Sequence, residues 1–342
     1  MRAVELKSFG SAQEVLTVVS DAHKPSPAPG EVLIEVRAAS VNPVDCAIRR
    51  GYGREVFRGK GQVGAQAFPI RLGRDAAGIV AALGEHVDDF RVGDRVYTAP
   101  THATQAEFIV ADALEVAHMP PALDFIQAAS LPFVALTTWN ALVGQVALTP
   151  HAAAGMRVVI TRGAGGVGSF AIQLMKAWGA YVAATCSTRN VEFVRALGAD
   201  EVIDYTCTRA LEALNDYDVV LDSAFDMETD LLKTLKTHAS AAYITITSPK
   251  VRLADEFGLK EGLRRAEELL TTRVVEQARL GRRYFWSFMR PDGAALAQVA
   301  DLVSRGRIRP LVDRVFPLAD VALAHEYCEG GMARGKIMLD FG

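Results

Sequence analysis

The residues of this chain that could do chemistry begin with three glycines at the spacing G-x-G-x-x-G. They follow a β-branched run at 158–160 and precede an apolar, helix-like pattern. In that context one glycine makes the tight turn, one lets backbone approach a pyrophosphate, and one lets helix and strand pack closely. The start of the helix would offer unpaired N–H groups to phosphate. Dinucleotide binding is therefore favoured over an incidental glycine turn, at Gly163, Gly165, Gly166, Val167 and Gly168.

The composition is that of an ordinary globular protein of two domains. The chain has 342 residues, half of them hydrophobic, and a formal net charge of −3. This charge argues against nucleic acid or an anionic membrane as the main partner. No apolar run is expected to reach the length needed to cross a bilayer. The first residues enter strand-like sequence directly, without a signal or transit pattern, so the expectation is a cytoplasmic protein.

The cysteines and histidines do not suggest a metal site. Cys46, Cys186, Cys207 and Cys328 are scattered, without a C-x-x-C motif or a Cys/His cluster. This spacing argues against a disulfide framework and against a four-cysteine zinc site. The seven histidines show no H-E-x-x-H or similar ligand spacing.

Hydrophobic patterning divides the chain into a β-rich part and an alternating part. Short strands at regular spacing suggest a barrel-like unit up to about residue 125. An apolar helix is expected over 125–142, and strand–helix alternation from 158 predicts a parallel sheet covered on both faces. A last strand at 335–341 resembles the first part in texture. The predicted domains are 1–125 with 290–342, and 126–289. The expected strands are 32–36, 76–84, 91–97, 106–110, 158–160, 180–185, 201–205, 218–222, 242–247 and 283–289.

The residues after the second strand of the alternating part indicate which nicotinamide would bind. An NAD site places a carboxylate about 20 positions after the glycines, on the ribose 2′-hydroxyl. Here the sequence is Ala183–Ser187, without an acid, followed by Thr188, Arg189 and Asn190. A guanidinium suits a 2′-phosphate, which favours NADP(H). The alternative is that Ser187–Asn190 merely caps the next helix.

Several motifs together resemble the medium-chain dehydrogenase/reductase superfamily, in its zinc-free quinone oxidoreductase branch. Within it the chain is most similar to the mitochondrial reticulon-interacting oxidoreductases and their bacterial relatives. The resemblance implies an α/β protein, with a Rossmann cofactor domain of doubly wound parallel sheet and a mostly-β, GroES-like barrel as catalytic domain. It also implies a homodimer through the sheet edge at Arg283–Met289, against the alternative of a monomer with that edge covered. The motifs lie at 29–34, 41–45, 68–75, 92–96, 128–136, 163–168, 197–200, 284–288, 306–310 and 333–337.

The resemblance also implies that no metal is bound. Zinc members of the superfamily place a cysteine where Asn42 stands and a His-Glu pair where Arg74 and Asp75 stand. They also carry a four-cysteine lobe that is missing here. Arg74 would repel a zinc ion.

Without a metal, the reaction expected is hydride transfer to a quinone or an α,β-unsaturated carbonyl. The developing oxyanion then needs hydrogen-bond donors rather than a Lewis acid. The candidates in the first domain are the Asn42 amide and the Tyr52 phenol, with Asp45 at a further family position. The alternatives are that Asn42 forms a turn with Pro43, Tyr52 packs, and Asp45 holds the loop.

Further cofactor contacts follow from the resemblance alone. Ser187 and Tyr205 match adenosine-side positions, Phe288 matches the nicotinamide-side wall, and Arg334 could add positive charge near phosphate. Tyr205 could instead pack at a strand end, and Arg334 could be a solvated turn residue.

Two departures from the family affect the reaction that is expected. Arg162 replaces a usual glycine, and Ser223–Asp226 replaces a usual glycine-rich turn. They support one alternative, an NADPH-binding regulatory protein with little catalysis. A second alternative, reduction of an enoyl thioester, follows from the same hydride chemistry.

Overall fold

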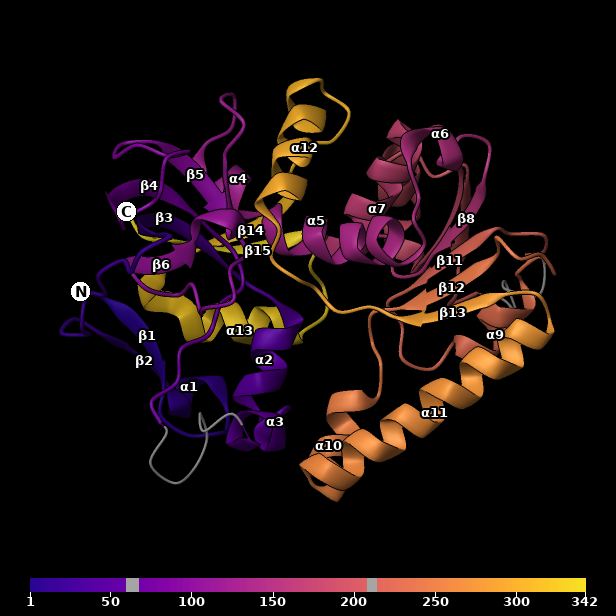
Figure 1. The fold of residues 1–342 in the computed structure, drawn as a ribbon, viewed down its shortest axis with the longest axis horizontal. Coiled ribbons are helices and arrows are strands. Elements are labelled where there is room, and N and C mark those ends of the chain that lie inside the picture. The colour runs from indigo at the N-terminus through magenta and orange to yellow at the C-terminus, as the bar shows by residue number, and fades with distance from the viewer. Residues whose placement is uncertain (60–67, 208–213) are drawn as a thin grey trace. The chain divides into compact units, whose positions relative to one another are not determined.

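The computed structural model describes residues 1–59, 68–207 and 214–342. They form two compact units, one of Met1–Leu136 with Arg290–Gly342 and one of Thr137–Met289 (Figure 1). The first unit thus continues past residue 125, where the sequence patterning placed the change of domain. The tail does return to the first unit, as its strand-like texture suggested.

The first unit is mostly β-structure. A small antiparallel sheet pairs β1 (Ala3–Leu6) with β2 (Leu16–Val19). A seven-stranded sheet has the order β14-β15-β3-β4-β5-β7, and β6 also pairs with β3. Its strands are β3 (Glu31–Val41), β4 (Ala76–Leu83), β5 (Arg95–Thr98), β6 (Phe108–Asp112), β7 (Val116–His118), β14 (Val312–Pro317) and β15 (Lys336–Asp340).

Strand β3 organises this sheet because it is long enough to pair with three others. One edge pairs with β4, and the other is shared by β6 at Glu31–Glu35 and by β15 at Ala38–Val41. The register against β4 shifts twice, between Leu33 and Ile34 and between Val36 and Ala38. Such irregularities bend a strand. The predicted strand at 32–36 is therefore only the first half of an eleven-residue strand.

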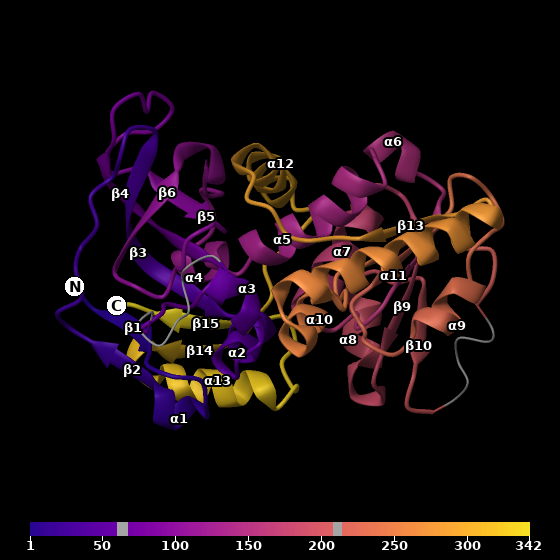
Figure 2. The ribbon, with the colours of Figure 1, turned by 60° about the horizontal axis from the view of Figure 1, so that its bottom comes forward.

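The helices of the first unit are short. Figure 2 shows α1, α2 and α13 side by side, and α13 packs on both of the others. Apolar side chains of α13, such as Val321 and Ala324, join those of β3 and β15 in one core cluster. The helices are α1 (Ala12–Val15), α2 (Pro43–Arg49), α3 (Arg54–Gly59), α4 (Phe125–Ala129), α12 (Gly293–Ser304) and α13 (Val321–Glu329).

The predicted helix over 125–142 is broken. Helix α4 ends at Ala129, α5 (Pro132–Trp139) begins at a proline, and a π-helical segment follows at Asn140–Gln145. Proline has no N–H to continue a helix but suits a first turn. By length and composition, Phe125–Gln145 is nevertheless apolar enough to cross a membrane, which contradicts the expectation that no run approaches that length. Its apolar window is 67% buried within the protein, as in a core helix.

The second unit is a parallel sheet of six strands in the order β10-β9-β8-β11-β12-β13. Numbered along the chain this is 3-2-1-4-5-6, the order of a doubly wound dinucleotide-binding sheet, so the predicted fold is confirmed. In Figure 1, α7 (Gly166–Ala177) lies on one face, and α9 (Glu228–Lys233) and α11 (Leu259–Arg279) lie on the other. The strands are β8 (Arg157–Ile160), β9 (Tyr181–Cys186), β10 (Glu201–Asp204), β11 (Val219–Asp222), β12 (Ala242–Thr245) and β13 (Arg283–Trp286); the other helices are α6 (Pro150–Ala153), α8 (Val191–Ala196) and α10 (Lys250–Phe257).

Strand β13 lies at the end of this sheet. Among the described strands it pairs only with β12. The expected edge position is thus confirmed, whereas the homodimer stays a prediction.

The glycine loop between β8 and α7 is packed too closely for side chains at two of its three glycines. A Cβ atom on Gly168 would lie 2.4 Å from the Arg162 carbonyl oxygen and 2.9 Å from the Gly163 Cα. A Cβ on Gly163 would lie between 3.1 and 3.3 Å from side chains that include Ile172 and Ala184. At Gly165 the nearest atom would be the Arg162 oxygen, at 3.4 Å.

This difference predicts unequal effects of two alanine substitutions. Gly168→Ala should lower the free energy of unfolding by about 1–3 kcal/mol, because rigid backbone must move. Gly165→Ala is the matched control and should change it by only about 0.5 kcal/mol. Urea unfolding followed by circular dichroism measures both. Equal stability of the two variants would show that the close approach at Gly168 does not constrain the loop.

Candidate functional site

The glycine loop lies where the chain changes direction across the sheet. Strands β8 and β11 are neighbours, β9 continues to one side of β8, and β12 continues beyond β11. Ligands of open α/β sheets bind at the carboxyl ends of strands at such a switch point. The first helical hydrogen bond of α7 runs from Ser169 N to Gly165 O (2.9 Å), so the N–H groups of residues 166–168 precede it. Its first turn carries no acidic residue. This helix end can therefore hold a phosphate group.

Arg162 shapes the loop through an uncommon backbone conformation. Its φ is +53°, in the left-handed region, and its side chain is exposed. Its N–H donates to Thr185 Oγ1 (3.1 Å), and its carbonyl accepts from Gly165 N (2.9 Å). Arg162 thus adopts a backbone conformation that glycine adopts more readily, and glycine is the residue expected at this position. Arg162 also brings a positive charge beside Asp222, one of the influences that lower the pKa of that carboxyl.

The carboxyl ends of β9 and β10 meet beside this loop. After β9 the chain forms a 3₁₀ turn at Thr188–Asn190, in which Arg189 is exposed. Tyr205 follows β10, donates its N–H to Cys186 O (3.1 Å), and is 51% exposed. The structure therefore brings Ser187, Arg189 and Tyr205 to one end of the sheet. The Ser187 side chain makes no capping hydrogen bond to this turn, although its backbone is extended at the N-cap position.

The carboxylate of Asp204 also lies at this carboxyl end of the sheet. Asp204, the last residue of β10, accepts hydrogen bonds from Thr206 N (2.9 Å) and Thr206 Oγ1 (2.6 Å). Hydrogen bonds from Thr188 and Thr206 hold the pKa of Asp204 below its usual value. Its charge is engaged by these hydroxyl and N–H groups.

Sequence reasoning missed a buried polar network that joins the ends of β8 and β11 to Tyr243 of β12. Asp222 accepts from Thr161 Oγ1 (2.9 Å), Ala224 N (2.8 Å) and Tyr243 Oη (2.6 Å). Burial raises the pKa of Asp222, and these hydrogen bonds act against that rise. Ser223 N donates back to Thr161 Oγ1 (2.7 Å). The turn that replaces a glycine-rich one is thus pinned to β8.

Phe288 lies after β13, at the far end of the same sheet. Its ring is 45% exposed, and the Lys250 ammonium lies 5.6 Å from the ring centre. Four strand spacings separate β9 from β13, about 19 Å at the usual spacing. Ser187 and Phe288 can therefore contact only opposite ends of one extended ligand.

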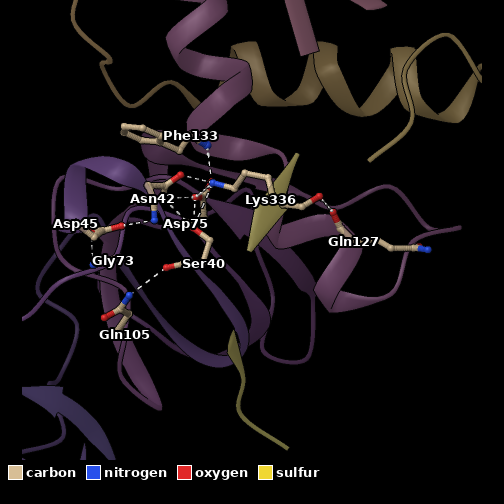
Figure 3. A network of polar contacts seen from close by, with 10 residues as sticks. Ser40, Asn42, Asp45, Gly73, Asp75, Gln105, Gln127, Phe133 and Lys336 are labelled. Carbon is tan, nitrogen blue, oxygen red and sulfur yellow. Dashed lines mark hydrogen bonds and ion pairs between the residues drawn. The ribbon is translucent and has the colours of Figure 1, made fainter. Parts of the chain in front are cut away.

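The first unit holds a second buried network, around Lys336 and Asp75 (Figure 3). The Lys336 ammonium donates to Asp75 Oδ2 (2.8 Å) and to Asn42 Oδ1. The carboxylate of Asp75 also accepts from Ser40 Oγ, from Asn42 Nδ2 (3.0 Å) and from Phe133 N (2.5 Å). Asp75 is fully buried and the Lys336 side chain nearly so. A charge pair this deep is tolerated because each atom has partners.

This network fixes how the Asn42 amide is oriented. Because Lys336 can only donate, Oδ1 must face it and Nδ2 must face Ser40 and Asp75. The amide nitrogen therefore has two acceptors, Ser40 Oγ (2.9 Å) and Asp75 Oδ2 (3.0 Å).

The other candidates of the first unit lie around α2. Asn42 is its N-cap, and Asp45 closes a capping box by accepting from Asn42 N (2.8 Å) and Gly73 N (2.9 Å). Asp45 is fully buried, and burial raises its pKa. Its two hydrogen bonds hold the backbone at Asn42 and Gly73, as in the loop-holding alternative above. Tyr52 follows the other end of α2 and is 36% exposed. A seven-residue helix spans about 10 Å, so Asn42 and Tyr52 are not brought together.

Arg334 is exposed, and its N–H donates to Asp313 (3.1 Å).

Lys336 and Asp222 were missed for related reasons, although each left a signal. Lys336 opens the apolar run Ile337-Met338-Leu339, and Asp222 ends the buried strand of the switch point. A charge inside a buried strand requires a partner, but sequence alone does not say which residue supplies it.

The metal-ligating residue types do not gather at either network. Among the residues that the structure describes, no group of three or more His, Cys, Asp and Glu side chains is arranged to hold a metal ion.

Comparison with known proteins agrees with this fold. The family model described as "Alcohol dehydrogenase GroES-like domain" matches residues 28–121, and the one described as "Zinc-binding dehydrogenase" matches residues 197–339. The protein named NAD(P)H oxidoreductase RTN4IP1, mitochondrial, of Danio rerio is 40% identical over 324 residues, which cover 91% of this chain and 84% of that protein. The protein of the same name from Homo sapiens is 38% identical, covering 91% and 82%. The solved quinone oxidoreductase of Coxiella burnetii is 31% identical with a TM-score of 0.82, covering 100% of this chain and 99% of that one.

These relatives correct one expectation and confirm another. The prediction of a cytoplasmic protein is contradicted, because the relatives from Danio rerio and Homo sapiens are both named as mitochondrial. A strand-like start of the sequence was too weak an argument for a compartment. The identity over nine-tenths of the chain confirms the predicted family. The chain belongs to the medium-chain dehydrogenase/reductase superfamily, in its quinone oxidoreductase branch.

Proposed function

We propose that this protein is an NADPH-dependent reductase that transfers hydride to a quinone or an α,β-unsaturated carbonyl without a metal. The observation that carries the proposal is the glycine loop at the β8–β11 switch point, with Arg189 in place of an acid after β9. The names of the relatives, NAD(P)H oxidoreductase and quinone oxidoreductase, support the same class of reaction.

The residues of the second unit fit a phosphorylated dinucleotide. The N–H groups that begin α7 suit a pyrophosphate, and Arg162 adds positive charge nearby. Ser187, Arg189 and Tyr205 suit the adenosine end, where a guanidinium binds a 2′-phosphate by paired charged hydrogen bonds. Phe288 suits the nicotinamide end. When bound, the coenzyme supplies a hydride to the acceptor.

The first unit supplies a cation where zinc members of the family hold their metal. Asn42 and Asp75 stand at positions of zinc ligands, and the Lys336 ammonium bonds to both side chains. An amide, one carboxylate and an ammonium are a poor donor set for zinc, which takes thiolate, imidazole and carboxylate ligands. The buried ion pair therefore supports zinc-independent chemistry.

Hydrogen-bond donors would stabilise the oxyanion that forms on the acceptor. The Asn42 amide, held in place by Lys336, is one candidate, and the partly exposed Tyr52 phenol is the other. Their separation along α2 implies that they serve different positions on the acceptor.

Turnover with defined acceptors tests the reaction class. Oxidation of NADPH should be rapid with quinones or enones and slow with enoyl thioesters, in protein shown by elemental analysis to hold no zinc. Asn42→Ala and Tyr52→Phe should each lower kcat/KM by about 10²-fold, as loss of a donor to an oxyanion does. Tyr181→Phe is the matched control, because Tyr181 begins β9, away from the carboxyl end of the sheet, and its hydroxyl donates to Glu201 (3.4 Å). Coenzyme binding without turnover of any acceptor would refute the reductase assignment.

Coenzyme preference tests the role of Arg189. Arg189→Ala should raise KM for NADPH by about tenfold, since loss of a charged hydrogen bond costs about 1.5 kcal/mol, and should leave KM for NADH unchanged. Arg195→Ala is the control, because this exposed arginine pairs with Glu192 on the next helix. An unchanged KM for NADPH in the Arg189 variant would reject phosphate recognition there.

The Lys336–Asp75 pair predicts a large loss of stability when one partner is removed. Lys336→Met should lower the free energy of unfolding by about 3–5 kcal/mol, because it leaves a buried carboxylate unpaired. Adding Asp75→Asn should restore part of it. Lys176→Met, which breaks a half-exposed pair with Asp200, should cost only about 1 kcal/mol. Urea unfolding measures all three, and similar losses for Lys336→Met and Lys176→Met would contradict the burial argument.

A further inference from the structure

Helix α2 packs on α13 (Figure 2). A histidine and two cysteines, none of them assigned a role above, belong to these two helices. Cys46 belongs to α2, and its Sγ lies 3.4 Å from His325 Nδ1 and 3.6 Å from His325 O. Cys328 lies three residues after His325 on α13, so both face the same side of that helix. Cys46 Sγ therefore sits against the helical turn that carries the second thiol.

The two cysteines pack in the same core cluster. Their mutual interaction raises the pKa of Cys46 and lowers the pKa of Cys328. The Lys336 ammonium acts in the same direction on Cys328, while burial and the carboxylates of Asp45 and Glu329 act against it. Cys328 is thus the thiol in which the reactive thiolate is favoured.

Exposure assigns the same roles. Cys46 is only 2% exposed, whereas Cys328 keeps part of its surface in solvent. His325 cannot serve as a strong base for the pair, because burial lowers its pKa to about 3. A small oxidant can therefore reach Cys328 first, with Cys46 already in contact behind it.

We propose that Cys328 and Cys46 form a peroxide-responsive pair that closes to a disulfide. The Cys328 thiolate attacks one oxygen of hydrogen peroxide, the O–O bond breaks, and hydroxide leaves, which gives a sulfenic acid. The Cys46 sulfur then attacks the Cys328 sulfur, the S–O bond breaks, and the thiol proton departs with the hydroxyl group as water. The two cysteines lose two electrons, and the peroxide gains them.

Closure of the disulfide would disturb the helix that carries the proposed donors. The two sulfurs, which are not bonded now, must approach each other to reach the bonded length of ~2.05 Å. Helix α2 would have to shift on α13, although its cap, Asn42, is held by Lys336 and Asp75. Oxidation should therefore lower the reductase rate. This consequence rests on the proposed function, whereas the disulfide itself does not.

Peptide mapping tests the pair without any assay of activity. The full-length protein is treated with hydrogen peroxide, alkylated, digested without reductant and analysed by mass spectrometry. A cross-linked peptide joining Cys46 to Cys328, lost after dithiothreitol, is expected in the wild type and in Cys207→Ser. In Cys46→Ser, dimedone should label Cys328 at least about tenfold more than buried Cys186, because the sulfenic acid has lost its partner.

Other outcomes overturn the proposal. The proposal fails if the cross-link is absent at peroxide doses that oxidise exposed Cys207, or if it forms only in urea-unfolded protein. It also fails if dimedone labels Cys46 in Cys328→Ser more than it labels Cys328 in Cys46→Ser. Thermal melting of each variant shows that it is folded. Mapping of the wild type decides the question even if a serine variant does not fold.

Discussion

A lysine ammonium buried in a β-sheet is the constraint on which the first unit depends. Lys336 must find a carboxylate and further acceptors, because an unpaired charge there would cost several kcal/mol. The partners of Lys336 and of its carboxylate come from segments far apart in sequence. Lys336 bonds to Ser40 near the end of β3, to Asn42 at the cap of α2 and to Asp75 before β4, and Asp75 accepts from Phe133 in the first turn of α5. Satisfying one ammonium therefore fixes the C-terminal strand, the central strand and two helix starts together.

The second unit is organised by a close approach of backbone rather than by charge. Gly168 lets α7 begin against the Arg162 carbonyl, and Arg162 takes a left-handed conformation to allow it. The Asp222 carboxylate then ties the end of β11 to Thr161 after β8 and to Tyr243 of β12. A phosphate-binding helix start and a rigid edge follow from these two features, which is what an extended dinucleotide requires.

Sequence reasoning found what is local and missed what depends on pairing. Glycine spacing and strand–helix alternation predicted the doubly wound sheet, and motif resemblance predicted the family; both are confirmed. The helix over 125–142 was wrong because Pro132 interrupts a continuous apolar pattern. Strand β14 and helix α13 were overlooked, because short elements are stabilised by partners that periodicity does not reveal. The assignments of site residues remain predictions, and the orientation of the Asn42 amide could not be foreseen without Lys336.

Helix α2 is the element on which the proposed chemistry of the first unit converges. Seven residues are too few for a helix to be stable alone, so its position must come from its contacts. At its start, Asn42 is held by the buried ion pair and by the capping box with Asp45. In its middle, Cys46 rests on α13. Helix α2 carries the proposed donor Asn42 at its cap and the thiol of Cys46 in its middle. The movement that a Cys46–Cys328 disulfide requires must therefore be resisted by the Lys336–Asp75 pair or must displace Asn42.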